Sequence, residues 1–195
     1  MSFINTVSDK SATGATAALY AQMQASHGHV QNLARAFSHR PEYMDAWDTL
    51  VDAIKARMDP RRYELVTLAA ALSLRSSYCA LSHGEVLLRD FFTAEELRSI
   101  AVDYRHSDLL PVDIAAMDYA QTIAKDALAV TPAHIEALRT QGLTDGEISD
   151  IAAAAAARCF FSKFLDALGT HPDASFASME PALRDRLTVG RNIEK

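Results

Sequence analysis

One short segment of the sequence holds residues whose types and spacing could support catalysis. Cys79 and His83 are four residues apart, so on a helix they share a face and their side chains can meet. Ser76 lies at or just before the start of this helix, so Cys79 is expected in its first turn. There, free backbone amides and the macrodipole favour a thiolate over a thiol. An imidazole within reach can accept the thiol proton. The spacing therefore predicts a nucleophilic Cys79 assisted by His83.

A carboxylate precedes this pair. Glu64 lies in an otherwise apolar stretch, where an unpaired carboxylate is costly. If the two helices form an antiparallel hairpin, Glu64 can turn toward Cys79 and His83. A thiol, an imidazole and a carboxylate in series would form a proton relay. The alternatives are that Cys79 is a small buried hydrophobe and that Glu64 pairs with Arg61 or another arginine.

The composition indicates which elements position these residues. Alanine, the strongest helix former, accounts for 35 of the 195 residues, against seven Gly and six Pro. No window alternates like a strand with hairpin signals at both ends. We therefore predict an all-α protein, built as a single domain over residues 1–195.

Helix boundaries follow from capping residues and prolines. They predict helices over about 41–55, 60–75, 77–91 and 111–128, a helix that begins at 94, a short helix from 132 that Gly142 closes, and a long helix from 145 that Gly169 ends. The cap at Thr93 and the one at Thr144 open similar stretches, which hints at two related helical halves. Residues 1–15 and 180–195 are expected to be peripheral extensions, the second reaching onto a neighbour.

Charge and motif content exclude several classes of protein. A net charge of −6 without a basic run argues against nucleic-acid binding. No apolar run approaches the length of a membrane span, and no secretory signal opens the chain, so we expect a cytoplasmic protein. The two cysteines make no disulfide framework. No motif implies a cofactor, and His27 with His29 lacks a third ligand, so no metal is predicted.

The segment around Cys79 resembles the core of the alkylhydroperoxidase AhpD-like and carboxymuconolactone decarboxylase superfamily. Peroxidase members carry a Glu, eleven residues, and then Cys-x-x-Cys-x-x-x-His; Glu64, Ser76, Cys79 and His83 fall at those spacings. The stretches 116–125, 130–148 and 160–169 are also similar to those of peroxidase-related members. The resemblance covers roughly residues 40–175. It implies an AhpD-like helical bundle with a central helical hairpin, assembled as a dimer, trimer or hexamer.

The resemblance also implies roles. Cys79 matches the thiol that attacks the peroxide, His83 the group that moves its proton, and Glu64 the acid end of the relay. Ser76 replaces the first motif cysteine, so it cannot close a disulfide; it can donate a hydrogen bond to a thiolate or cap the helix. Tyr78, beside Cys79, is a further supporting candidate. Cys159 is expected to be a buried structural thiol.

Three functions follow as hypotheses. The first is a one-cysteine, peroxiredoxin-like antioxidant enzyme that reduces hydroperoxides and is restored by an external thiol. The second is a decarboxylase-like acid–base enzyme acting on a small lactone or carboxylic acid, for which Arg75 is the nearby cation that the sequence offers. The third is a non-enzymatic oligomeric binding protein.

Overall fold

The predicted all-α architecture is confirmed. A computed structural model describes residues 2–195, which form ten α-helices and three short 3-10 helices, with no β-strand in that range. The first five helices are α1 (Gly14–His27), α2 (Asn32–Ala36), α3 (Pro41–Lys55), α4 (Pro60–Ser73) and α5 (Ser77–Asp90). The other five are α6 (Ala94–Asp103), α7 (Pro111–Asp126), α8 (Pro132–Thr140), α9 (Asp145–Ala167) and α10 (Pro181–Leu187).

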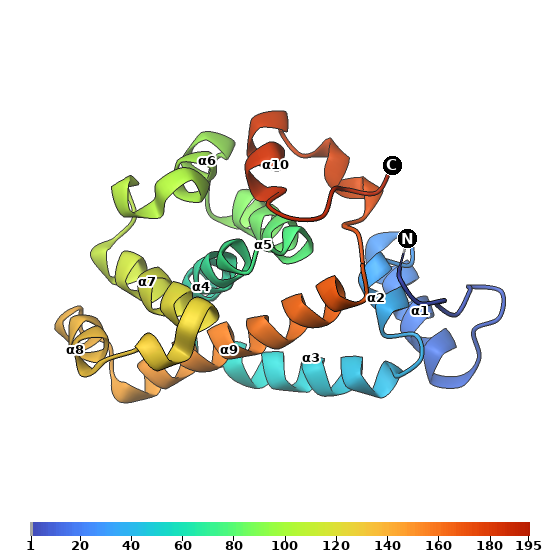
Figure 1. Cartoon of the computed structure of the whole chain (residues 1–195), viewed down its shortest axis with the longest axis horizontal. Helices are drawn as coiled ribbons and strands as arrows, with labels where there is room; N and C mark the ends of the chain where they lie inside the picture. Colours follow the sequence, from blue (N-terminus) through green and yellow to red (C-terminus); the bar gives the residue numbers. More distant parts are fainter. Residues whose placement is uncertain (1) are drawn as a thin grey trace.

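Helix α4 is the centre of the bundle. It packs against α5, α7 and α9, and the cartoon shows it between α7 and α5, with α9 below (Figure 1). Every residue from Tyr63 to Ala71 is buried, as expected of a helix that is apolar on nearly all sides. Helices α4 and α5 form the predicted hairpin. Glu64 and Thr67 are the polar residues within this buried run, so each needs a partner.

The helix ends lie where the capping residues predict them. The carboxylate of Asp59 accepts a hydrogen bond from the amide of Arg62 at the start of α4. Thr93 and Thr144 each form a complete capping box, at the starts of α6 and α9. Gly169 follows α9 with a φ of 73°, in the left-handed region that favours glycine.

Part of the carboxyl-terminal segment belongs to the core of this chain rather than extending onto a neighbour. Helix α10 packs against α6 and α5 (Figure 1), and its residues Leu183 and Leu187 are fully buried. Gly84 on α5 leaves room for this contact: a Cβ there would lie 2.4 Å from Leu187 Cδ1, and the leucine side chain would have to shift. Two leucines that fill a groove of their own chain explain the difference from the expected peripheral extension.

A buried ion pair joins α4 to α7. Asp113 has no exposed surface and accepts hydrogen bonds from Arg61 Nη2 at 2.5 Å and Arg62 Nε at 2.9 Å. Arg61 is therefore the partner of Asp113 and not of Glu64. Within residues 2–195, no helix is long and apolar enough to cross a membrane.

Candidate active site

Cys79, near the start of α5, lines a cavity. It is the third residue of α5, in the first turn as predicted, and only 1% of it is exposed. The cavity has a volume of about 830 Å³ and is lined by residues of α1, α3, α5 and α9, among them Met23, Trp47, Phe161 and His83. We call it the thiol cavity. Cys79 and His83, the predicted nucleophile and imidazole, therefore line the same cavity.

Glu64 and His83 are in direct contact across the α4–α5 hairpin. Glu64 Oε2 lies 2.5 Å from His83 Nδ1. The other carboxylate oxygen, Oε1, lies 3.4 Å from Lys55 Nζ. Glu64 and His83 are both buried, so the contact between them is shielded from solvent. The acid end of the predicted relay is therefore assembled in the folded chain.

The hydrogen bonds around His83 assign its tautomer. Thr67 Oγ1 donates to the carbonyl of Tyr63 at 2.8 Å, so toward His83 Nδ1, 3.1 Å away, it can only accept. The Glu64 carboxylate, the other neighbour of His83 Nδ1, can likewise only accept a hydrogen bond. Nδ1 therefore carries the proton, and Nε2 is left with a lone pair and no hydrogen-bond partner among residues 2–195. A base with its lone pair available is the form suited to taking a proton.

Burial and neighbouring charges set the ionisation of this pair. Burial, reinforced by the positive charge of Arg158, lowers the pKa of His83 below its ordinary value, against the opposing effect of Glu64. Burial alone would raise the pKa of Glu64. The hydrogen bond from His83 and the charge of Lys55 outweigh it, so this pKa is lowered. At neutral pH the pair is therefore a carboxylate and a neutral imidazole.

The hydrogen-bond partner of Cys79 is a residue that the sequence analysis did not select. Arg158 Nη1, on α9, lies 3.4 Å from Cys79 Sγ. Among the described residues no hydrogen bond links Cys79 directly to His83. The structure thus joins Glu64 to His83 and Cys79 to Arg158, and both pairs line the thiol cavity through Cys79, His83 and Arg158. A proton would pass between the pairs through a bound substrate or water.

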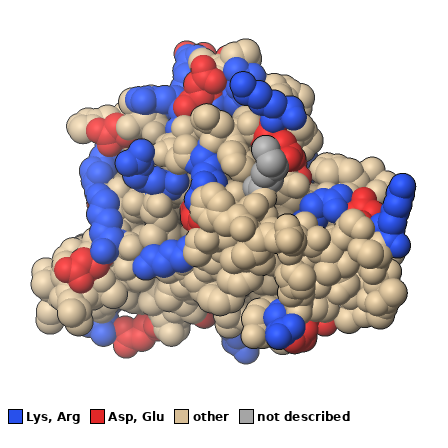
Figure 2. Space-filling view, turned by 45° about the vertical axis from the view of Figure 1, so that its right-hand side comes forward, with Lys and Arg blue, Asp and Glu red and all other residues tan. Residues whose placement is uncertain are grey.

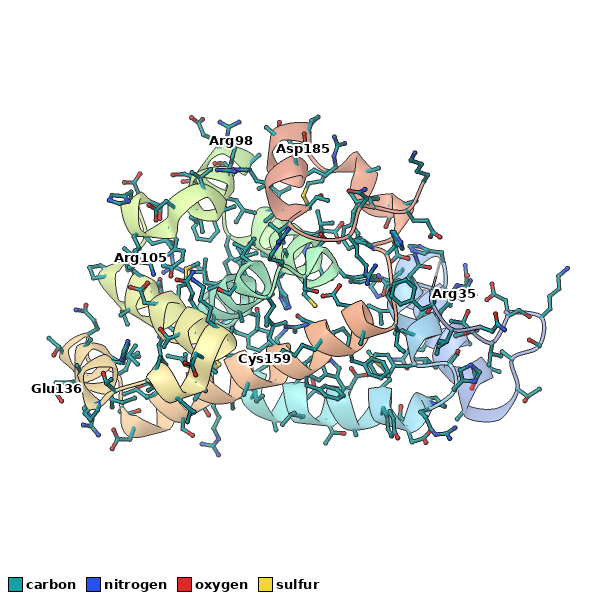
Figure 3. The ribbon with its side chains drawn as sticks, viewed as in Figure 1. Arg35, Arg98, Arg105, Glu136, Cys159 and Asp185 are labelled. Atoms are coloured by element: carbon teal, nitrogen blue, oxygen red, sulfur yellow. The ribbon has the colours of Figure 1, made fainter. Side chains whose placement is uncertain are left out.

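Three expectations need correction. Ser76 occupies the N-cap position of α5, but its side chain makes no capping hydrogen bond, and its buried Oγ has no partner in residues 2–195. Cys159 is a free thiol on α9 (Figure 3) and is half-buried rather than buried. Partial burial raises the pKa of the Cys159 thiol, which makes it a poor nucleophile at neutral pH. Arg75 is exposed, donates to the Val189 carbonyl and does not line the thiol cavity.

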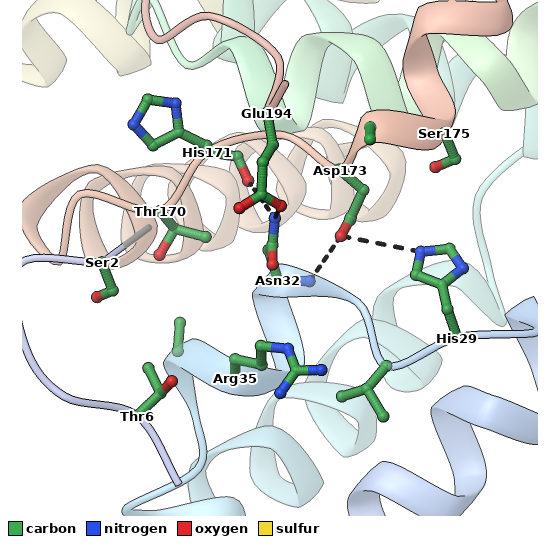
Figure 4. A pocket seen from close by; sticks show the side chains of 13 residues that line it. Ser2, Thr6, His29, Asn32, Arg35, Thr170, His171, Asp173, Ser175 and Glu194 are labelled. Atoms are coloured by element: carbon green, nitrogen blue, oxygen red, sulfur yellow. Dashed lines mark hydrogen bonds and ion pairs between the residues drawn. The ribbon is translucent and has the colours of Figure 1, made fainter. Parts of the chain in front are cut away.

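Tyr78 connects α5 to the segment after α9. Its hydroxyl donates to Asp173 Oδ2 and accepts a hydrogen bond from the amide of Leu33 at 3.3 Å. Asp173 Oδ1 accepts from the amide of Asn32 at 2.8 Å and lies 3.8 Å from His29 Nε2 (Figure 4). Burial and Asp173 raise the pKa of Tyr78 well above its ordinary value, so Tyr78 stays neutral. It supports the backbone beside Cys79.

The charges of the site contrast with those of the surface. On the face shown in Figure 2, basic and acidic side chains are interspersed and separated by uncharged surface. Glu64, His83 and Arg158 are instead all buried. Across residues 2–195 there is no group of three or more His, Cys, Asp or Glu side chains that could hold a metal ion.

Comparisons with known proteins identify similar sequences and folds. The model of the carboxymuconolactone decarboxylase family matches residues 41–122, which include the α4–α5 hairpin. A peroxidase-related protein from Ralstonia eutropha JMP134, described as an alkylhydroperoxidase AhpD core, is 25% identical, with a TM-score of 0.79 and coverage of 90% of this chain and 94% of its own. No curated protein matches the sequence.

Other solved structures share the fold at lower identity. A peroxidase-related protein from Silicibacter sp. TM1040 is 19% identical, with a TM-score of 0.73 and coverage of 90% of this chain and 91% of its own. The debrominase Bmp8 is 15% identical, with a TM-score of 0.75 and coverage of 95% and 97%. Residues 41–122 match the model of the carboxymuconolactone decarboxylase family, and the chain as a whole shares the fold of AhpD-like proteins.

Proposed function

We propose that the protein is a thiol-dependent peroxidase in which Cys79 reduces an organic hydroperoxide. The observation that carries this proposal is the placement of Cys79 and a neutral, Glu64-bound His83 in the wall of one cavity. The cavity is far larger than hydrogen peroxide, and Trp47, Met44 and Phe161 give it apolar walls that suit an organic substituent.

His83 Nε2 takes the proton of the Cys79 thiol through a bound water or the hydroperoxide, and the thiolate attacks the terminal oxygen of the hydroperoxide. The O–O bond breaks, Cys79 becomes a sulfenic acid, and the departing alkoxide receives the proton from His83 as an alcohol. Two external thiols then restore Cys79, releasing water and forming a disulfide between them. Ser76 supplies no resolving thiol, so the reductant must come from outside the chain.

The test is consumption of cumene hydroperoxide with dithiothreitol as reductant. We expect turnover by the wild type and by Cys159→Ser, and only the background rate from Cys79→Ser. Cys159→Ser is the matched control because it removes the other thiol. Turnover that survives in Cys79→Ser would contradict the proposal.

A second candidate is acid–base chemistry on a carboxylic acid, and one observation favours it. Arg158 and Lys55 line the thiol cavity, so the site contains cations for a carboxylate that the sequence analysis had not found. Glu64 and His83 would then move protons, and Cys79 would only line the wall. Conversion of a lactone carboxylic acid by Cys79→Ser, without hydroperoxide consumption by the wild type, would select this function.

A third substrate to assay beside the hydroperoxide and the lactone carboxylic acid is a bromopyrrole. The reason is that a cysteine-to-alanine variant of the debrominase Bmp8 has been crystallised with 2,3,4-tribromopyrrole. Debromination that depends on Cys79 would mean that Cys79 is the nucleophile but that the substrate is a bromopyrrole and not a hydroperoxide. Absence of turnover with every substrate would favour an oligomeric binding protein.

A further inference from the structure

Arg158 is a buried cation without an acidic partner. It lies in the buried face of α9, with Ile151, Ala154, Phe161 and Leu165, and only 5% of its surface is exposed. Among residues 2–195, no carboxylate lies within ion-pair distance of its guanidinium. Its buried Nε also has no hydrogen-bond partner there. A charge removed from water in this way is costly unless something compensates it.

The surroundings of Arg158 supply two kinds of compensation. Its guanidinium carbon lies 5.2 Å from the ring centre of Trp47 and 5.4 Å from that of Phe161, within the range of cation–π attraction. Its Nη1 donates to Cys79 Sγ at 3.4 Å. Aromatic rings attract a cation but carry no net charge. A thiolate at Cys79 is the group in contact with Arg158 that can neutralise it.

We infer that Arg158 is a catalytic residue whose guanidinium is the counter-ion of the Cys79 thiolate; this inference rests on the nucleophilic role proposed above for Cys79. Burial favours the neutral thiol, so a full positive charge in contact with Sγ is needed to hold the thiolate in the cavity. The first turn of α5 adds only a partial charge.

The other ionisable groups near Cys79 do not replace Arg158. Tyr63 on α4 and Tyr78 on α5 are both neutral, because burial raises the pKa of each phenol. His83 on α5 is neutral after its pKa is lowered by burial. Burial also acts to lower the pKa of Arg158, but the neighbouring Cys79 and Tyr63 raise it overall, so this residue stays charged.

The test measures the thiolate and not the turnover. In a Cys159→Ser background, the rate of Cys79 alkylation by iodoacetamide is followed against pH, together with the ultraviolet absorbance of the thiolate. Arg158→Met keeps an apolar side chain beside the rings of Trp47 and Phe161 and removes the charge. We expect its alkylation at pH 7 to fall by at least about tenfold, with recovery as the pH is raised. Arg158→Lys should retain most of the rate.

Lys163→Met is the matched control, because Lys163 is an exposed cation on the same helix; its alkylation rate should equal that of the parent. Should Arg158→Met fail to fold, as judged by circular dichroism, the comparison of Arg158→Lys with Arg158→Gln replaces it. An unchanged alkylation rate and absorbance in a folded, uncharged variant would overturn the inference.

The two proposals fail in different ways. If the wild type consumes no hydroperoxide but Arg158→Met still loses its thiolate, the counter-ion role stands and the peroxidase function falls. If the wild type is a peroxidase and Arg158→Met alkylates normally, the peroxidase function stands and the counter-ion role falls.

Discussion

His83 Nδ1 and Glu64 Oε2 lie 2.5 Å apart across the α4–α5 hairpin, with the imidazole held as a base whose free nitrogen is Nε2. Residues nineteen positions apart in the sequence are thus fixed in one geometry before any substrate binds. A preorganised base loses little entropy at the moment of proton transfer.

The pH profile should report the His83–Glu64 contact. The neutral form of His83 is the active one, and its pKa is lowered, so the acidic limb of kcat/KM should lie below the ordinary imidazole value of about 6.5. In Glu64→Gln the carboxylate that raises this pKa is gone. The limb should therefore move to still lower pH. A limb that moves upward would contradict the assignment.

Replacing His83, the proposed base, should lower kcat/KM more than the change at Glu64 does. In His83→Asn, no imidazole accepts the thiol proton or returns it to the alkoxide. General acid–base catalysis contributes about 10²–10⁴-fold, and we expect kcat/KM for hydroperoxide to fall by that amount. His27→Asn is the control, since His27 also lines the thiol cavity but lies on α1. Equal losses in the two variants would argue against a specific role for His83.

Much of this architecture could be predicted from the sequence because its signals are local. Pro41, Pro60, Thr93 and Thr144 act within one helical turn, so they place helix starts without knowledge of the tertiary fold. The spacing of Cys79 and His83 is likewise a property of one helix. The hairpin on which the site is built is a tertiary feature, and it was expected from the family resemblance of this segment rather than from such local signals.

The partners of the site residues are not local, and most were missed. Arg158 meets Cys79 from 79 positions away, and Asp173 meets Tyr78 from 95. One signal for Arg158 was present: it falls at helical spacing between Ile151 and Leu165, where a charge interrupts an apolar stripe. Nothing local indicated that the Ser76 hydroxyl would be buried instead of capping α5.

The ion pair between α4 and α7 should be important for stability. In Asp113→Ala, Arg61 and Arg62 lose a fully buried partner. Breaking a buried pair costs about 3–5 kcal/mol, and we expect about 2–3 kcal/mol here because both arginines are partly exposed and can reach water. Urea unfolding measures the change. Arg139→Ala, which removes exposed ion pairs, should leave the midpoint unchanged.

The contact between Tyr78 and Asp173 should also stabilise the fold. Tyr78→Phe leaves the buried Asp173 carboxylate without one of its donors, which should lower the free energy of unfolding by about 1.5–3 kcal/mol. Tyr43→Phe is the control, because Tyr43 is exposed. If Tyr78→Phe is as stable as the wild type, the hydroxyl is not a structural tie.

Oxidation of Cys79 by one equivalent of cumene hydroperoxide tests the central claim most directly. The protein is trapped with dimedone, a reagent that labels sulfenic acids, and the modified cysteine is located by peptide mass spectrometry. We predict rapid, stoichiometric labelling of Cys79 in the Cys159→Ser background and much slower labelling when His83→Asn is added. Cys79 that remains unlabelled while the hydroperoxide persists would contradict the account.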